Sequence, residues 1–394
     1  MKEYKMNKGW AVFMYIFGTL LIAVFGFLLL MPIIPAVKND LAPNSYWFIG
    51  PLSLVMLCVF VIAVLDTAKG KFVIDKNRIY NITTLSKREL FLHEIKGYRI
   101  NDKFIIIESK SENKKDIKIS TYFGKTDEIK KWLRDNNYRD LDVIEEIDEK
   151  KEILNNQEFG WNKTERKNKL NRARIFAKIM NGIGAVAGVW VLFFPNPYKY
   201  AIIPCIAFPI VSLIVLRIFK GLIRIDEKKN SAYPSIYFGF LMSTLCIFLR
   251  ALIDFELLEY SNVWIPTLLI ALTFASTLYF TNLKTEHTKT PDILSFLGIF
   301  ALVICYTFGT FITVNCLYDH SEPEIFKTSV LDKRISTGKT TTYYLQLGPW
   351  GPRKESDEVT VSKEQYNNSK INDEAEVYLM KGQFDIPWFE VSTN

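Results

Sequence analysis

The sequence predicts a polytopic α-helical membrane bundle of about seven spans that carries two small β-rich soluble modules. The first observation behind this is a set of apolar stretches, at residues 10–31, 46–65, 176–194, 198–217, 235–253, 263–280 and 292–316. As a helix, each is about long enough to cross a hydrocarbon core of ~30 Å, which requires ~20 residues. The second is a pair of polar segments, 66–174 and 317–394, with short runs of strand-forming residues. Averaging over both kinds of segment keeps the mean hydropathy at only +0.08.

Charge and cysteine usage restrict the classes of function. Segment 66–174 holds 26 Lys and Arg against 20 Asp and Glu, a net charge of +6, and segment 317–394 holds 9 against 13, a net charge of −4. Because the positive charge adjoins apolar stretches, it indicates a membrane-proximal face rather than a nucleic-acid partner. All five cysteines lie in or beside apolar stretches, and the three histidines are far apart. We therefore expect no metal site, no disulfide framework and no cofactor.

The loops between the stretches alternate in their density of Lys and Arg, which orients the chain in a membrane. The leader before residue 10 and the loops 218–234 and 281–291 are basic, whereas loop 254–262 contains no Lys or Arg. By the positive-inside rule, the N-terminus and the module after the second span are cytoplasmic. Seven spans then place the C-terminus outside. The first stretch is longer than the apolar region of a cleaved signal peptide, so we expect an uncleaved helix.

The first 137 residues predict a two-span hairpin (1–65) and a small β domain (66–137). Lys71–Asp75 and Arg78–Ile82 flank a Lys76-Asn77 turn, about four more short strands follow, and a helix opens at Thr126. This order over residues 46–137, with the corner Leu92-His93-Glu94-Ile95-Lys96-Gly97-Tyr98, resembles the bacterial pleckstrin-homology-like (PH-like) membrane proteins. The resemblance implies a protein of the bacterial inner membrane whose cytoplasmic module binds or scaffolds and does not catalyse.

The charged linker 138–174 predicts an acidic helix and then a basic helix that continues into the third span. We expect its cations to contact anionic lipid headgroups through Arg166, Lys167, Lys169, Arg172 and Arg174. Near an anionic leaflet, each such charge contributes roughly 1 kcal/mol. Ordinary positive-inside topology explains the same charges and is the interpretation we favour.

The five-span bundle (175–316) is nearly free of charge at the centres of its spans, which argues against an ionisable transport path. Arg250 is the exception, and Asp254 lies one helical turn away on the same face. The pair is either an arginine with a local partner, or part of an outward-facing charged vestibule that includes Glu256 and Asn315. Gly184 and Gly188 form a GxxxG pattern, which predicts close packing within the chain or in a homodimer.

The C-terminal segment (317–394) predicts about five strands in a small OB- or SH3-like barrel. Its aromatic residues, including Tyr343, Tyr344, Trp350 and Trp388, are typical either of a core or of a surface for glycan or a partner. Gly338-Lys339-Thr340 and Gly124-Lys125-Thr126 lack the earlier glycine of a phosphate-binding loop. We find no catalytic motif and expect a non-enzymatic scaffold or sensor; the alternative is a transporter or channel subunit using Arg250 and Asp254. The expected partners are the lipid bilayer and a protein partner or second copy, without nucleic acid.

Overall fold

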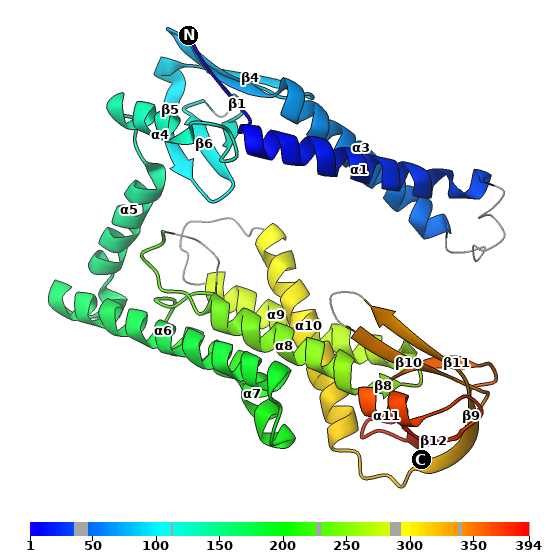
Figure 1. Ribbon diagram of the computed structural model, residues 1–394. Coiled ribbons are helices and arrows are strands. Elements are labelled where there is room, and N and C mark those ends of the chain that lie inside the picture. The colour runs from blue at the N-terminus through cyan, green and yellow to red at the C-terminus, as the bar shows by residue number, and fades with distance from the viewer. Residues whose placement is uncertain (35–45, 112, 226–229, 284–292, 338–340, 394) are drawn as a thin grey trace. The chain divides into compact units, whose positions relative to one another are not determined.

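The computed structural model describes residues 1–34, 46–111, 113–225, 230–283, 293–337 and 341–393 (Figure 1). Across these ranges seven helices are long and apolar enough to cross a membrane: α1 (Lys8–Leu30), α3 (Tyr46–Lys69), α6 (Lys163–Phe193), α7 (Tyr198–Ile218), α8 (Tyr237–Asp254), α9 (Ser261–Leu283) and α10 (Ile293–Leu317). Together with small antiparallel β-sheets, they confirm the predicted fold class. The chain forms two compact units, Met1–Glu149 and Lys150–Asn394.

The first unit contains two antiparallel sheets and a covering helix. One sheet has the order β1-β2-β3-β4 and the other β5-β6-β7. The strands are β1 (Lys2–Lys5), β2 (Lys71–Ile74), β3 (Arg78–Ile82), β4 (Lys87–Phe91), β5 (Ile95–Ile100), β6 (Phe104–Ser109) and β7 (Ile117–Ser120). Helix α4 (Thr126–Asp135) contributes Ile129 and Leu133 to a core that also contains Phe72, Ile79 and Ile105, all of them fully buried. A continuous apolar core explains why strands this short are stable together.

Strand β1 was not expected from the sequence, which assigns its lysines to a basic leader. Lys5 is paired with Lys71 and Lys2 with Ile74, so β1 is the antiparallel neighbour of β2. Tyr4 is the one side chain of β1 that is buried, and a single apolar position among four residues is too weak a pattern to predict a strand. In the sequence, α1 and α3 lie between β1 and β2, which are neighbouring strands of the sheet. The start of α1 and the end of α3 are therefore both next to this sheet.

The second unit begins with the bundle α6–α10. Gly184 of α6 faces Gly239 of α8 so closely that a Cβ built on Gly184 would lie 2.5 Å from the Gly239 Cα. Gly188 is packed in the same way against Met242 and Cys246. The small-residue face of α6 is thus occupied by α8 within the chain. Between α7 and α8, the segment after Ile218 folds back onto the bundle and buries Leu222, Ile223, Ile225, Ala232, Tyr233 and Ile236.

The C-terminal β-module is a six-stranded antiparallel sheet of order β11-β10-β9-β12-β13-β8 (Figure 1). Its strands are β9 (Glu324–Thr337), β10 (Thr341–Leu347), β11 (Asp357–Val361), β12 (Glu374–Met380), β13 (Trp388–Thr393) and β8 (Glu256–Leu257). A short helix, α11 (Lys363–Asn368), begins with a capping box between Ser362 and Gln365. The sequence indicates all of these strands except β8, which comes from the connection between α8 and α9.

Candidate functional site

The connection between α8 and α9 is the strongest candidate for a functional site, because it joins the bundle to the β-module. We use the name β8 junction for strand β8, residues 315–319 at the end of α10 and just after it, and residues 382–388. Strand β8 pairs Leu257 with Trp388 and Glu256 with Phe389. Around this pairing, Leu257, Ile312, Cys316, Ile386 and Trp388 form a buried apolar cluster drawn from the bundle and the β-module alike.

Two polar residues of α10 and its exit fasten residues 382–388. The buried Asn315 donates from Nδ2 to the Ile386 carbonyl at 2.9 Å, and its Oδ1 accepts from the Phe384 N–H at 2.9 Å. Asp319 Oδ2 accepts from the Gly382 N–H at 2.7 Å and from Trp388 Nε1 at 2.9 Å. Burial disfavours the charged form of Asp319, but these hydrogen bonds and those from Ser321 outweigh it and lower the pKa of the carboxyl. Asn315 therefore holds the β-module and does not line an open vestibule.

Arg250 and Asp254 lie beside this junction, at the end of α8. Arg250 Nε is 2.5 Å from Asp254 Oδ2, and the same oxygen accepts from the Tyr198 hydroxyl at 2.6 Å. Arg250 also approaches the Leu192 carbonyl at 3.4 Å. The side chains of Arg250 and Asp254 are 20% and 17% exposed. The charges of this pair are thus largely directed at each other and at neighbouring helices.

Glu256 is the most strongly perturbed carboxyl of the junction. Burial is the main cause that raises its pKa from 4.5 to about 7; the nearby Asp357 contributes to the rise, and Arg353 opposes it. Arg353 is engaged elsewhere: it lies 2.7 Å from Asp357 and donates to the Leu258 carbonyl at 3.3 Å. Glu256 is therefore a carboxyl group whose pKa lies near neutral pH, at the point where the bundle meets the β-module.

The five cations that were expected to contact lipid headgroups differ in how far they are exposed. Arg166 is buried and donates to the carbonyls of Leu154 (2.7 Å), Gly160 (2.8 Å) and Trp161 (3.3 Å). Lys167 and Arg172 are exposed. The other two are partly buried: Lys169 lies over the Phe159 ring, and Arg174 donates to the Ala232 carbonyl at 3.4 Å. Arg166 is thus committed to holding the start of α6, while Lys167 and Arg172 are directed to the surroundings.

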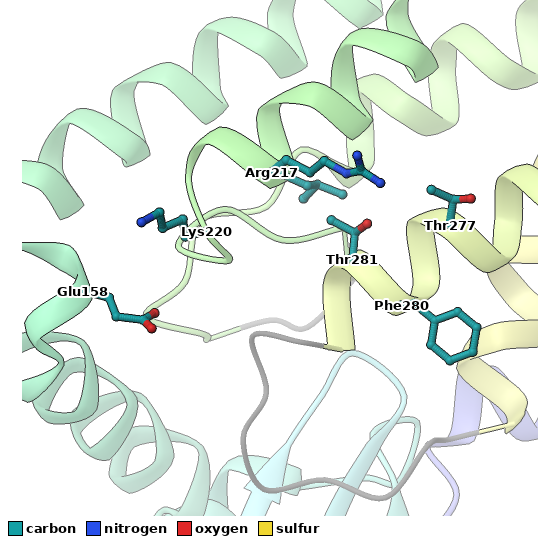
Figure 2. Close-up of a pocket in the computed structure, with 7 residues that line it drawn as sticks. Glu158, Arg217, Lys220, Thr277, Phe280 and Thr281 are labelled. Carbon is teal, nitrogen blue, oxygen red and sulfur yellow. The ribbon is translucent and has the colours of Figure 1, made fainter.

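A pocket of about 540 Å³ lies where α7 and α9 end, near Glu158 of the short helix Gln157–Phe159 (Figure 2). It is lined by Glu158, Leu216, Arg217, Lys220, Thr277, Phe280 and Thr281. Figure 2 shows Arg217 on the side of Thr277 and Thr281, and Lys220 on the side of Glu158. The sequence indicated that loop 218–234, which follows α7, is basic. It did not indicate that α9 contributes threonine side chains to the same pocket.

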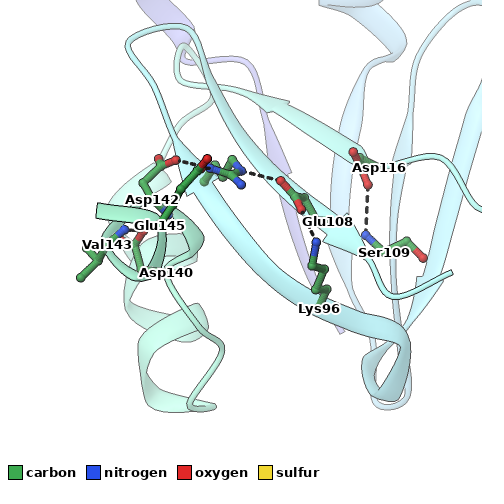
Figure 3. Close-up of polar contacts among 9 residues, drawn as sticks. Lys96, Glu108, Ser109, Asp116, Asp140, Asp142, Val143 and Glu145 are labelled. Carbon is green, nitrogen blue, oxygen red and sulfur yellow. Dashed lines mark hydrogen bonds and ion pairs between the residues drawn. The ribbon is translucent and has the colours of Figure 1, made fainter. Parts of the chain in front are cut away.

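In the first unit, one arginine forms ion pairs with three carboxylates. Arg99 of β5 lies 2.5 Å from Glu108 of β6, and 2.7 Å from each of Asp142 and Glu145 of α5 (Leu141–Asn155). Figure 3 shows Asp142 and Glu145 of α5 on one side of this network and Glu108 of β6 on the other. The network attaches the start of α5 to the sheet. Periodicity could not reveal it, because the partners are distant in the sequence and each looks like an ordinary surface charge.

Of the aromatic residues noted in the C-terminal sequence, Trp350 and Trp388 are buried in the module or its junction, and Tyr343 and Tyr344 are partly buried. In the part of the chain that the structure describes, no group of three or more His, Cys, Asp or Glu side chains could hold a metal ion. Residues 226–229 of the basic loop 218–234, residues 284–291 of the basic loop 281–291, and Gly338-Lys339-Thr340 lie outside the described ranges.

Comparison of the chain with protein-family models, with curated proteins and with solved structures found no match.

Proposed function

We propose that this chain is a non-enzymatic scaffold or sensor of the bacterial inner membrane, which couples a cytoplasmic PH-like module to a β-module outside the cell membrane. The observation that carries the proposal is β8, a strand of the C-terminal sheet that is contributed by the connection between two apolar helices. A displacement of the sheet acts directly on the ends of α8 and α9, because they are continuous with one of its strands. A module tethered only by a flexible linker would not have this property.

Charge supports the proposed sidedness. Arg217 and Lys220 lie at the end of α7 that is opposite to the β8 junction, whereas the β-module segment has a net charge of −4. The positive-inside rule therefore favours a cytoplasmic location for the former and an external location for the latter. The pairing of β1 with β2 keeps the N-terminus with the first β domain, on the same side of α1 and α3.

Anionic lipid is part of the proposed role of the cytoplasmic face. The contact residues we retain are Lys167, Lys169, Arg172 and Arg174; Arg166 is omitted because its guanidinium is buried and bonded to backbone carbonyls. A protein partner or a second copy is the other expected partner.

The sidedness and the coupling have separate tests. A reporter fused after Asn394 should be active only outside the cytoplasm; a cytoplasmic signal would overturn the threading. For the coupling, Asn315→Ala removes two hydrogen bonds from a buried site and should destabilise the junction by about 1–3 kcal/mol. Hydrogen exchange measured by mass spectrometry should then accelerate at residues 382–388 and also at β8 and the adjoining turns of α8 and α9.

The control for this variant is Asn367→Ala, because Asn367 is exposed on the short helix α11. Acceleration confined to residues 382–388, with α8 and α9 unchanged, would contradict coupling through the junction. Solute flux into proteoliposomes that depends on Arg250 would replace the proposal with the transporter alternative.

A further inference from the structure

The pocket at the ends of α7 and α9 is lined by two cations, Arg217 and Lys220. Arg217 is in the last turn of α7, and Lys220 lies two residues after the end of this helix. Among the described residues, neither side chain has a hydrogen-bond or ion-pair partner, although Glu158 lines the same pocket. The helix dipole favours cations at the C-terminal end of α7, but it does not explain a shared cavity with hydroxyl groups on another helix.

The polar side of the pocket has the chemistry of a phosphate site. An arginine presents a planar fork of N–H donors that matches phosphate oxygens, and a lysine adds a mobile point charge. Thr281 and Thr277 stand one helical turn apart on α9, on the side of the pocket on which Arg217 lies (Figure 2). The Thr277 hydroxyl donates to the Thr273 carbonyl at 2.8 Å, so Thr281 supplies the hydroxyl donor of the pocket. Among the described residues that line the pocket, Arg217, Lys220 and Glu158 carry a net charge of +1, which suits a ligand with a single negative charge.

The helix faces below the pocket are apolar and uncovered. On α7, the positions one and two turns before Arg217 are Ile214 and Ile210, which are 51% and 49% exposed. On α9, Ile270 lies two turns before Thr277 and is 50% exposed, and Phe280 at the pocket itself is 60% exposed. Helices α7 and α9 are packed neighbours. In a membrane-spanning bundle such surfaces face acyl chains, so the polar pocket and the apolar faces form one continuous, two-part surface.

We propose that this pocket binds the phosphodiester group of a membrane phospholipid whose acyl chains lie along α7 and α9. Arg217 and Lys220 pair with the phosphate, Thr281 donates a hydrogen bond to it, and Glu158 disfavours headgroups with more than one negative charge. This site goes beyond the scaffold or sensor role and does not depend on it. It is also separate from the cations of α6, since none of them lines the pocket.

The test is native mass spectrometry of the full chain, purified in a neutral detergent and titrated with dihexanoyl phosphatidylglycerol. One lipid should bind saturably to the unaltered protein. Two cations that each contribute roughly 1 kcal/mol correspond to about 30-fold weaker binding in the double variant Arg217→Gln/Lys220→Gln. The matched control is Lys199→Gln, an exposed lysine at the opposite end of the same helix, which should bind like the unaltered protein.

Two further arms separate the sources of phosphate and guard against misfolding. Glycerophosphoglycerol, the deacylated form of the same lipid, carries the singly charged phosphodiester without acyl chains and should not compete at concentrations that saturate the lipid; effective competition would identify a soluble phosphate ligand and overturn the lipid proposal. Glu158→Gln should bind the anionic lipid more tightly than the unaltered protein, a gain that misfolding cannot produce. Equal binding by the double variant, or an equal loss in Lys199→Gln, would refute the site.

Discussion

Replacing Glu256 by glutamine should remove a specific pH dependence from the stability of the β8 junction. In the folded protein, burial and the proximity of Asp357 raise the pKa of this carboxyl from 4.5 to about 7. Below pH 4.5 the group is protonated whether the protein is folded or unfolded. As the pH rises from 4.5 through 7, the unfolded chain releases the proton first, so the folded state loses stability over this interval.

The size of this loss follows from the shift. One pKa unit corresponds to 1.36 kcal/mol, so the shift from 4.5 to about 7 sets an upper limit of about 3 kcal/mol. Glu256 is only partly buried, and solvent screening reduces the value to about 2 kcal/mol. For a unit of this size, that difference is equivalent to about 5 °C in melting temperature. Glutamine keeps the shape of the side chain and cannot ionise.

The assay is thermal unfolding of the purified protein in detergent at pH 5 and pH 8. The decrease in melting temperature between these conditions should be about 5 °C smaller in Glu256→Gln than in the unaltered protein. Glu259→Gln, an exposed carboxylate in the same connection, is the matched control and should keep the original dependence. Identical pH dependence in Glu256→Gln and the unaltered protein would refute the reasoning that this carboxyl is neutral at the junction.

Two other substitutions test the packing of the bundle and the attachment of α5. Gly184→Ala should destabilise the bundle by about 1–3 kcal/mol in unfolding titrations, because the new Cβ would overlap the backbone of the facing helix. Gly182→Ala, with no atom within 4 Å of the new Cβ, should leave stability unchanged or slightly raised. Arg99→Gln should accelerate hydrogen exchange at residues 141–149 several-fold, since three carboxylates lose their cation. Lys96→Gln, which removes a more exposed charge 3.3 Å from one of the same carboxylates, should have the smaller effect, and equal effects would contradict the network.

The features that could be predicted from the sequence are those whose physical cause is local. The apolar stretches predict helices whose ends differ from the observed ones by a few residues, because length and hydropathy are properties of consecutive residues. The exception is the start of α6 at Lys163, where the basic helix expected in the linker continues into the span. The strands of the C-terminal module were recognisable for the same reason, since alternating residues and turn-forming residues lie within each segment. The i, i+4 spacing of Arg250 and Asp254 likewise indicated that these two side chains could meet.

The candidate site depended on pairings that no local pattern contains. Strand β8 has two residues and β1 has four, and both exist because a distant strand supplies their hydrogen bonds. Arg166 and Lys167 are adjacent cations of the same basic segment and cannot be told apart by sequence pattern. Arg166 is nevertheless buried and donates to three backbone carbonyl groups, whereas Lys167 is exposed.

The sequence by itself determined that this protein has seven membrane-length apolar helices, two polar β-rich segments and an alternating distribution of positive charge. Hydropathy, strand propensity and charge are properties of consecutive residues, so they can be recognised without knowledge of the fold. Only the tertiary structure decided that a connection between two spans becomes a strand of the C-terminal sheet, and that Arg217 and Lys220 share a pocket with Thr281. Both features depend on which distant segments of the chain lie together. Backbone hydrogen bonding and burial determine this arrangement only when the whole chain is folded.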